Sequence, residues 1–389
     1  MKKNIFFLLV FLLGCSHPSE NVNDNEVTSY PTKQIITPVP TSTFQAVSPS
    51  ISATIAPNLS DVCSKSVDDT QSDSIDYFVF SASWAGKSDI YLMNGFTGSQ
   101  ERITVNPDFD VHPKLNHSKK QIAFLRYKED KGELYVRDIP NGREKLISPT
   151  DVSVFPDFFW SPNDRCILFT GQSIQTREFT DAYLITIDGM VQNLTLDETS
   201  ALGFYASSWS SNGKSVLFSG HLDTSLTIWH TFISDLKSEK IADLTKNQFG
   251  DWSPTWNPRK DLIAFIGFSD FINTGSIFLL EPINFTQKEI KVSKGNPSIL
   301  KWAPNGEKLF YVTTSEQEDI TTYDVWVWDL ITQETRMIVS LNDDIIGINP
   351  VEANQVIVYI YSAEKENVSA YLVDTESGDN MLIAEDIDY

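Results

Sequence analysis

Short runs of apolar residues, separated by turn residues, follow one another along most of the chain, and residues 251–293 show this pattern most completely. The first run ends at Trp256, the second is the apolar Leu262-Ile-Ala-Phe265, the third alternates over Ser276-Ile-Phe278, and the fourth, residues 289–293, is short and half polar. Continuous apolar runs predict buried strands, and the half-polar run predicts an exposed outer strand. The stretch leaves no room for a helix, so it predicts one four-stranded antiparallel meander.

This unit recurs along the sequence when Trp256 and the apolar triplet that follows it serve as the ruler. The anchors, at steps of 45 to 49 residues, are Leu115, Trp160, Trp209, Trp256, Trp302 and Ile348. The third strand recurs seven times, at Asp89, Glu133, Ala182, Thr227, Ser276, Asp324 and Ser369. Because such a sheet has two apolar faces and cannot bury them alone, radial stacking is expected. The pattern therefore predicts an all-β fold, a seven-bladed β-propeller of four-stranded antiparallel blades.

The first copy of the repeat lacks an obvious inner strand of the tryptophan type. We predict that residues 62–76 supply this strand, or that the first blade is irregular. The propeller domain is therefore expected to span residues 62–389. Most of the nine tryptophans fall at repeat positions, so we expect them to pack blade against blade rather than to stack on ligands.

Residues 1–14 have the pattern of an export signal. Lys2 and Lys3 precede an apolar run, residues 5–13, that is too short to span a bilayer. The run ends in Leu12-Leu-Gly-Cys15, which resembles the lipobox of bacterial lipoproteins. The resemblance implies cleavage before Cys15 and lipidation of Cys15, so that acyl chains anchor the protein to a membrane. The alternative is an ordinary secretory signal followed by an incidental cysteine.

Residues 15–61 comprise this cysteine and a linker rich in proline, serine and threonine. The linker has no sustained apolar period, so it is expected to be a disordered tether. Two further cysteines follow, Cys63 and Cys166. Cys166 lies at the start of a predicted second strand and is expected to be a small buried hydrophobic residue. A disulfide between Cys63 and Cys166 remains the alternative.

The repeat resembles the WD40-like (PD40) propeller of the TolB type, whose units read P-x-W-S-P-D-G-K, then I-A-F, D-I-Y and L-T. The matching segments include Trp160-Ser-Pro-Asn-Asp, Trp209-Ser-Ser-Asn-Gly, Trp302-Ala-Pro-Asn-Gly, Leu194-Thr and Leu244-Thr. The resemblance covers the chain from about residue 77 to its end and implies the propeller fold. TolB itself has six blades and a preceding α/β domain, where this chain has the anchor and tether. A role in a Tol-Pal-like envelope system is therefore an analogy only.

Two carboxylates lead into inner strands at equivalent places, in Asp110-Val-His112-Pro and Asp251-Trp-Ser-Pro. They are expected near the mouth of the propeller channel, where Asp110, His112 and Asp251 could contact a ligand or a cation. The alternative, which we favour, is that each aspartate pins its own inter-blade turn by hydrogen bonds to backbone amides. Uncharged residues such as Phe155 take the matching place in other blades. The histidines and cysteines show no metal-binding spacing, so no metal or other cofactor is predicted.

The chain is strongly acidic, with a formal net charge of -22. Residues 341–389 hold eleven acids and one base, and residues 61–76 hold five acids and one base. The first and last blades are neighbours in a closed propeller, so these acids are expected to meet at one seam. Such a seam disfavours nucleic acid and favours an envelope protein with a basic patch. The candidate partner-binding residues are Asp343, Asp344, Asp374, Glu376 and Asp379, and the alternative is a solubilising surface without a partner.

Together these patterns predict a monomeric propeller outside the cytoplasm, facing the periplasm or the cell exterior, that touches the membrane only through its lipid anchor. It is expected to be a protein-binding or assembly module of the cell envelope and not an enzyme. No Gly-x-Ser-x-Gly elbow of a hydrolase is present. The alternative is a small-ligand, glycan or cation-dependent enzymatic site at the mouth of the channel. Glycan recognition would use aromatics expected to be exposed, such as Trp84 and Tyr205.

Overall fold

The computed structural model describes residues 59–64 and 77–389, except for residues 96, 140–141, 177–178, 197–200, 223–228, 246–249, 269–274 and 319. All described residues belong to one compact unit, Ile55–Tyr389. The expected signal and Cys15 lie outside the described residues, as does the tether up to residue 58. Within the described part of the chain, no helix has the length and apolar content needed to cross a membrane.

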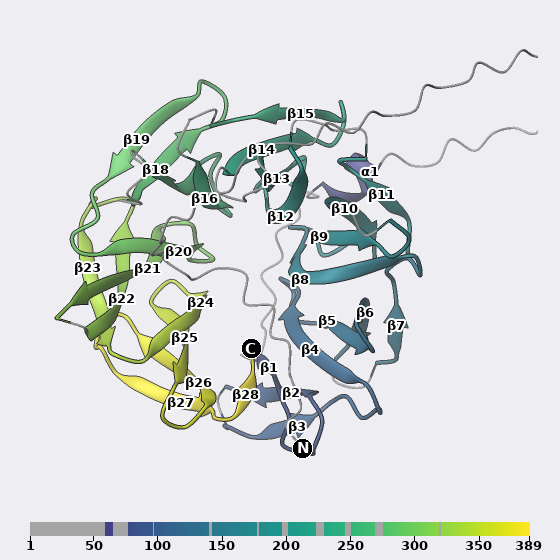
Figure 1. Ribbon diagram of the computed structural model, residues 1–389, viewed down its shortest axis with the longest axis horizontal. Coiled ribbons are helices and arrows are strands. Elements are labelled where there is room, and N and C mark those ends of the chain that lie inside the picture. Colours follow the sequence, from purple (N-terminus) through teal and green to yellow (C-terminus); the bar gives the residue numbers. More distant parts are fainter. Residues whose placement is uncertain are drawn as a thin grey trace, which may run out of the picture. The chain divides into compact units, whose positions relative to one another are not determined.

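In these described residues, seven four-stranded antiparallel sheets stand side by side in a ring, each sheet forming one blade (Figure 1). The strands of each blade are given from the inside outward. Blade 1 consists of β28 (Ile387–Asp388), β1 (Tyr77–Ala82), β2 (Asp89–Asn94) and β3 (Gln100–Arg102), and blade 2 of β4 (Phe109–Leu115), β5 (Gln121–Lys128), β6 (Lys131–Asp138) and β7 (Glu144–Leu146). Blade 3 consists of β8 (Val152–Trp160), β9 (Cys166–Ser173), β10 (Thr180–Thr186) and β11 (Val191–Asn193), and blade 4 of β12 (Gly203–Trp209), β13 (Ser215–His221), β14 (Trp229–Asp235) and β15 (Lys240–Asp243). Blade 5 consists of β16 (Asp251–Trp256), β17 (Ile263–Phe268), β18 (Gly275–Glu281) and β19 (Thr286–Ile290), and blade 6 of β20 (Asn296–Trp302), β21 (Lys308–Gln317), β22 (Ile320–Asp329) and β23 (Thr335–Leu341). Blade 7 consists of β24 (Asp344–Glu352), β25 (Gln355–Ser362), β26 (Asn367–Asp374) and β27 (Asn380–Ala384). The predicted seven-bladed, all-β propeller is confirmed.

Three of the four repeat tryptophans donate a hydrogen bond to the preceding blade, whereas Nε1 of the fourth, Trp256, is buried without a hydrogen-bond partner among the described residues. Trp160 Nε1 donates to the carbonyl oxygen of Lys114 at 3.1 Å, and Trp209 Nε1 donates to that of Phe159 at 2.9 Å. Trp302 makes the same type of contact at 3.3 Å. All three rings are buried in the cores between blades. The prediction that these tryptophans pack blade against blade is confirmed.

The last strand of the chain closes the ring. β28 pairs with β1, so that Asp388 lies opposite Ser81 and Ile387 lies opposite Ala82. Ile387 is 5% exposed and packs in a core formed by blades 7 and 1. Of the two alternatives for blade 1, the prediction that residues 62–76 supply the inner strand is therefore wrong. The blade is irregular instead, because its inner strand has two residues and comes from the other end of the chain. The inner edge of β1 is already taken by β28, which follows directly from the outer strand of blade 7.

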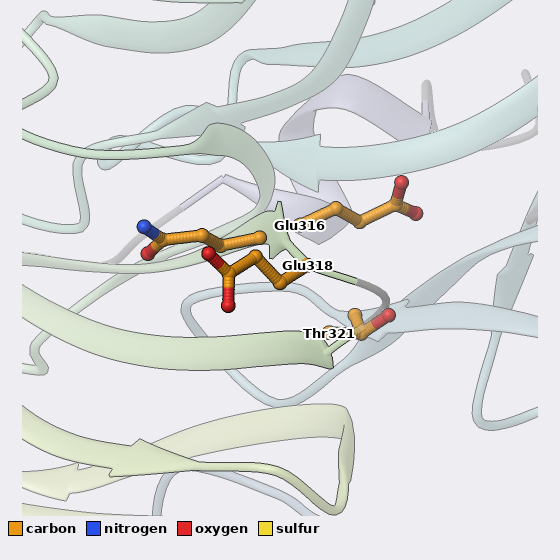
Figure 2. Close-up of a pocket in the computed structure, with 4 residues that line it drawn as sticks. Glu316, Glu318 and Thr321 are labelled. Carbon is orange, nitrogen blue, oxygen red and sulfur yellow. The ribbon is translucent and has the colours of Figure 1, made fainter.

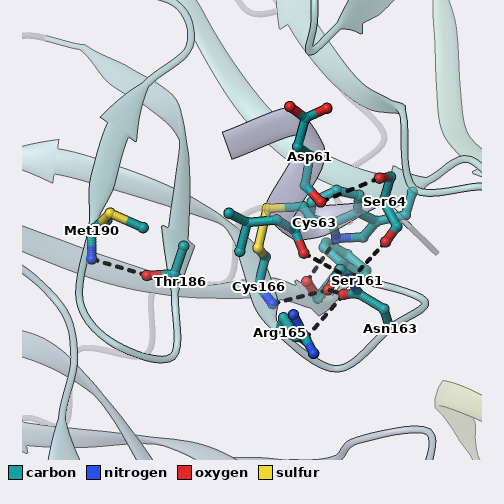
Figure 3. Close-up of a disulfide and its surroundings, with 12 residues drawn as sticks. Asp61, Cys63, Ser64, Ser161, Asn163, Arg165, Cys166, Thr186 and Met190 are labelled. Carbon is teal, nitrogen blue, oxygen red and sulfur yellow. Dashed lines mark hydrogen bonds between the residues drawn. A yellow bond between two sulfur atoms is a disulfide. The ribbon is translucent and has the colours of Figure 1, made fainter. Parts of the chain in front are cut away.

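A short helix, α1 (Leu59–Cys63), lies against blade 3 instead (Figure 3). Cys63 forms a disulfide with Cys166 of β9, with their Cα atoms 5.5 Å apart. The side-chain amide of Asn163 donates to the carbonyl oxygens of Val62 at 2.8 Å and Ser64 at 2.7 Å. Cys166 is fully buried, as expected, but the expectation that it is unpaired is wrong, because α1 places Cys63 beside it.

Replacing both cysteines, Cys63→Ser with Cys166→Ser, should lower the free energy of unfolding by about 2–5 kcal/mol. The physical reason is that the disulfide links positions separated by 103 residues and so restricts the unfolded chain. The measurement is urea unfolding with and without a reducing agent. The reductant should destabilise the wild type and leave the double variant unchanged, and a wild type indifferent to reductant would contradict the pairing.

Candidate functional site

The two faces of the ring carry different connections. Each inner strand begins at what we call the loop face, which carries the linkers between blades and the hairpins between second and third strands. Each inner strand ends at the hairpin face, which carries the hairpins between first and second strands and between third and fourth strands. A residue's position along its strand therefore assigns it to one face.

Asp110 and Asp251 occupy equivalent places at the loop-face ends of inner strands, and both are buried, at 0% and 1% exposed. The carboxylate of Asp110 accepts from Arg126 Nε at 2.7 Å and Nη2 at 2.9 Å, and from Asn106 Nδ2 at 2.5 Å. Burial acts to lower the pKa of the Arg126 guanidinium. The hydrogen bonds that Arg126 donates to Asp110 and Glu144 outweigh this effect and raise the pKa overall. Asp110 thus pins its turn, through side chains rather than backbone amides.

His112 lies at a bulge of β4, where the pairing register shifts between Val111 and Lys114. Its φ of 53° is in the left-handed region, and Ser253 has a φ of 51° at the equivalent bulge of β16. Burial, helped by the charge of Lys114, lowers the pKa of His112 to about 4, so the imidazole is neutral near pH 7. Across the described ranges, no group of three or more His, Cys, Asp or Glu residues could hold a metal ion.

The five candidate partner-binding residues divide between the two faces. Asp343 and Asp344 lie at the start of β24, on the loop face. Asp374, Glu376 and Asp379 lie at and after the end of β26, on the hairpin face. The nine residues of β24 separate the two groups by about 25 Å. The negative charges that were expected together at one seam therefore lie on opposite faces of the ring.

Asp61, which was expected at the same seam, lies on α1 beside blade 3. Of the other acids between residues 61 and 76, all fall outside the described residues. Asp61 therefore adds no negative charge to the seam between blades 1 and 7.

The acids on the hairpin face hold their own turn. Asp374 Oδ1 accepts from the backbone N–H groups of Glu376 and Ser377, both at 2.9 Å. These hydrogen bonds lower the pKa of Asp374, and the bond from Ser377 has the largest effect. Asp329 makes the same turn in blade 6 by accepting from the N–H groups of Ile331 and Thr332. The carboxylate of Asp374 therefore has a structural role in a repeated hairpin.

A larger set of exposed carboxylates lies on the loop face of blades 6, 7 and 1, and we call it the acidic sector. It consists of Glu316, Glu318, Asp343, Asp344, Glu364, Glu366, Glu385 and Asp386. Lys365 lies among them, with Nζ 4.0 Å from a carboxylate oxygen of Glu385. The side chains of the sector come from blades 6 and 7 and from the linker between β27 and β28, so the contact between neighbouring blades brings them to one face.

A surface hollow of about 420 Å³ lies within this sector, at the hairpin between β21 and β22. Glu316, Gln317, Glu318 and Thr321 line it, and the carboxylates of Glu316 and Glu318 point away from each other (Figure 2). A second hollow of about 410 Å³ shares Glu316 and is lined otherwise by uncharged residues of β20, β21 and the preceding turn. The divergent carboxylates suit a broad protein contact better than a single ion.

The two aromatics considered for glycan binding have different environments. Trp84 is 42% exposed, but its Nε1 donates to the carbonyl oxygen of Glu385 at 3.0 Å and its ring lies 4.8 Å from that of Tyr91. Trp84 therefore ties blade 1 to the end of blade 7. Tyr205 is half-buried, with its ring 5.3 Å from that of Trp229. The two rings belong to different blades and form no common platform.

Two lysines, Lys114 and Lys301, lie at the centre of the ring and belong to none of the sequence motifs described above. Lys114 Nζ donates to the carbonyl oxygens of Phe158 at 2.8 Å and Pro156 at 3.2 Å, and lies 4.7 Å from the ring centroid of Phe159. Lys301, from blade 6, places its Nζ 6.0 Å from the same centroid. The signal in the sequence is that both lysines immediately precede the last residue of an inner strand.

Comparison with known proteins supports the fold. No curated protein matches this sequence. The family described as Eukaryotic translation initiation factor eIF2A matches residues 169–333, less than half of the chain, so no membership follows. TolB from Acinetobacter baumannii is similar in structure, with a TM-score of 0.50 and 14% identity over 76% of this chain and 75% of that chain.

Two enzymes share the architecture as well. An oligogalacturonate lyase from Vibrio parahaemolyticus has a TM-score of 0.58 and 11% identity over 79% of this chain and 84% of that chain. A prolyl endopeptidase has a TM-score of 0.61 and 15% identity over 85% of this chain, which spans 51% of that enzyme. Identities this low establish only that the chain has a TolB-like propeller fold.

These enzymes overturn the prediction that the chain is not an enzyme. That prediction took the propeller for a binding scaffold, whereas oligogalacturonate lyase and prolyl endopeptidase contain the same kind of propeller. The physical reason is that the blades fix the backbone while the side chains at the loops and at the ring centre vary freely. The fold therefore gives no ground for excluding catalysis.

The variant Asp110→Asn should lower the free energy of unfolding by about 3 kcal/mol, because it leaves the buried guanidinium of Arg126 without its bidentate partner. Asp108→Asn, in the linker just before β4, is the matched control and should cost less than about 0.5 kcal/mol. Chemical denaturation of both variants gives the comparison. An Asp110→Asn protein as stable as the wild type would mean that the carboxylate does not hold the turn.

Proposed function

We propose that this chain is an exported, lipid-anchored β-propeller that binds a basic protein of the cell envelope through its acidic sector. The observation that carries the proposal is the set of exposed carboxylates that blades 6 and 7 and the linker to β28 present together on the loop face. Carboxylates gathered on one face attract a partner rich in lysine and arginine and chiefly raise the rate of association.

Export is supported by the disulfide that joins α1 to blade 3. Disulfides persist in oxidising compartments such as the periplasm and the cell exterior and are rare in the cytoplasm. The lipobox-like Leu12-Leu-Gly-Cys15 agrees with this location. The TolB-like architecture is consistent with an envelope role by analogy of fold.

A protein partner is favoured by the apolar groups beside the acids. Ile320 is 55% exposed at the tip of the β21–β22 hairpin, and Trp84 is 42% exposed at the blade 1 edge of the sector. Protein interfaces combine such apolar and aromatic anchors with a polar rim. Two hollows lie at this hairpin, and Glu316 lines both of them.

A photoreactive amino acid placed at Ile320 should crosslink a basic envelope protein in intact cells. Adding Asp343→Asn, Glu364→Gln and Glu366→Gln should reduce the crosslinked yield about tenfold, because three carboxylates no longer steer the partner. The yield is read from blots, and mass spectrometry of the product identifies the partner.

The controls use the opposite face. The photoreactive residue at Ile331, which is 67% exposed in a hairpin-face turn, should give little of this product. The substitutions Glu334→Gln, Glu352→Gln and Asp379→Asn change the net charge equally on the hairpin face and should leave the yield unchanged. Equal crosslinking from both faces, or equal loss in both triple variants, would argue against the acidic sector.

The anchor is tested separately with Cys15→Ser. This variant should leave the membrane fraction and appear in the soluble extracytoplasmic fraction, because the acyl chains that hold the protein can no longer be attached. The measurement is fractionation with a high-salt wash, which removes proteins held only by charge. A variant that still sediments with membranes would refute the lipid anchor without affecting the interaction face.

A further inference from the structure

The centre of the ring carries a charge opposite to that of the surface. We propose that it binds a small oxyanion, a carboxylate or phosphate group, between the amino groups of Lys114 and Lys301 and beside the ring of Phe159. This site differs from the acidic sector in position and in sign, and it does not depend on the proposed function.

The three residues occupy one level of the repeat. Lys114, Phe159 and Lys301 are the penultimate residues of β4, β8 and β20, the inner strands of blades 2, 3 and 6. Lys301 therefore extends from blade 6 to the Phe159 ring of blade 3, which also contacts Lys114 from blade 2. Strands that are distant in sequence thus bring two ammonium groups to a single aromatic ring.

The hydrogen bonds of the two ammonium groups leave room for a ligand. Lys114 uses two of its three donors on the carbonyl oxygens of Phe158 and Pro156, which braces blade 2 against blade 3. Within the described part of the chain, Lys301 Nζ makes no hydrogen bond or ion pair with the protein, and its side chain is exposed to solvent. A structural brace accounts for Lys114 alone, whereas an oxyanion would engage Lys301 and the remaining N–H of Lys114.

The surroundings compensate the two positive charges incompletely. Burial lowers the pKa of Lys114 to about 8, with Asp157 opposing this shift and Lys301 adding to it. The surrounding strands also desolvate the amino group of Lys301 and lower its pKa, again opposed by Asp157, although the side chain keeps surface in contact with water. Asp157 is exposed and lies within 4 Å of neither ammonium group, and the nearby His112 is neutral at pH 7. The site therefore holds two ammonium groups against one carboxylate.

Aromatic groups set the size and character of the ligand. The rings of Phe158 and Phe159 lie under Lys114, and the ring of Tyr389 lies against that of Tyr359, with centroids 4.6 Å apart and the planes tilted by 41°. The pKa of Tyr389 is raised by burial first, then by Tyr359 and by the negative charge of Asp157, so Tyr389 lies near that carboxylate. A partly apolar site with two ammonium donors favours a small anion over a polyanion such as nucleic acid.

The test is a titration of the full-length protein, with lysines labelled at 13Cε, by sodium phosphate or sodium acetate at constant ionic strength set with sodium chloride. In chloride alone, Lys114 should titrate near pH 8. Either oxyanion, by binding the ammonium form, should raise the pKa of Lys114, and phosphate should do so at lower concentration because it carries more charge. Lys301→Met should weaken phosphate binding about tenfold or more, because it removes a charge-assisted donor.

Lys240→Met, on the exposed outer strand β15, is the matched control and should bind phosphate like the wild type. Lys301→Met should itself raise the pKa of Lys114 in chloride, which shows that the variant folds and that the two amino groups are neighbours. If neither oxyanion shifts Lys114 beyond the chloride reference, or if Lys301→Met binds phosphate as well as the wild type, the site does not exist. Binding of phosphate but not acetate would support the site and restrict the ligand to one with a phosphate group.

Discussion

A four-stranded blade with two apolar faces is stable only between two other blades, and this constraint governs the whole structure. In the described residues there are seven core clusters, and each lies at a joint between neighbouring blades. Six joints form between blades that follow one another along the chain. The seventh joins blade 7 to blade 1 across the longest sequence separation, and β28 makes it by donating its backbone to β1. Ile387 of this strand packs in the same core as Phe80 of blade 1 and Ile383 of blade 7.

Most of the fold could be predicted because its stabilising contacts are repeated. Cys166 N donates to Ser161 Oγ, and Ser215 N donates to Ser210 Oγ, in the same inner hairpin. Ala182 N donates to Thr195 Oγ1 of the Leu-Thr motif. β28 could not be predicted, because two residues are too short for a hydrophobic period. The Cys63–Cys166 pairing depends on where α1 packs, which the sequence around either cysteine does not show. In the same way, the sequence around Lys114 or Lys301 does not show that both lie near the ring of Phe159.

The functional candidates were harder to place for a related reason. A strand runs from one face of the ring to the other, so acids only thirty residues apart, such as Asp344 and Asp374, lie on opposite faces. The hairpin face repeats its turns from blade to blade, and its polar side chains satisfy the backbone. The loop face varies instead, and the ten-residue strands β21 and β22 carry Glu316 and Glu318 at their hairpin. Variable loops on a fixed scaffold are where binding usually resides.

The loop face and the ring centre present opposite charges within one protein of net charge -22, and this has consequences for how they respond to salt. The acidic sector is exposed, so its attraction acts over a screening length of about 10 Å at 0.1 M salt and about 3 Å at 1 M. Lys114 is half-buried among aromatic rings and has a lowered pKa, so screening reaches it less. A rise in salt should therefore slow a basic partner at the loop face while specific oxyanions still compete with chloride at the centre. Because the two regions attract ligands of opposite charge, neither competes for the other's ligand, and a single propeller can serve both.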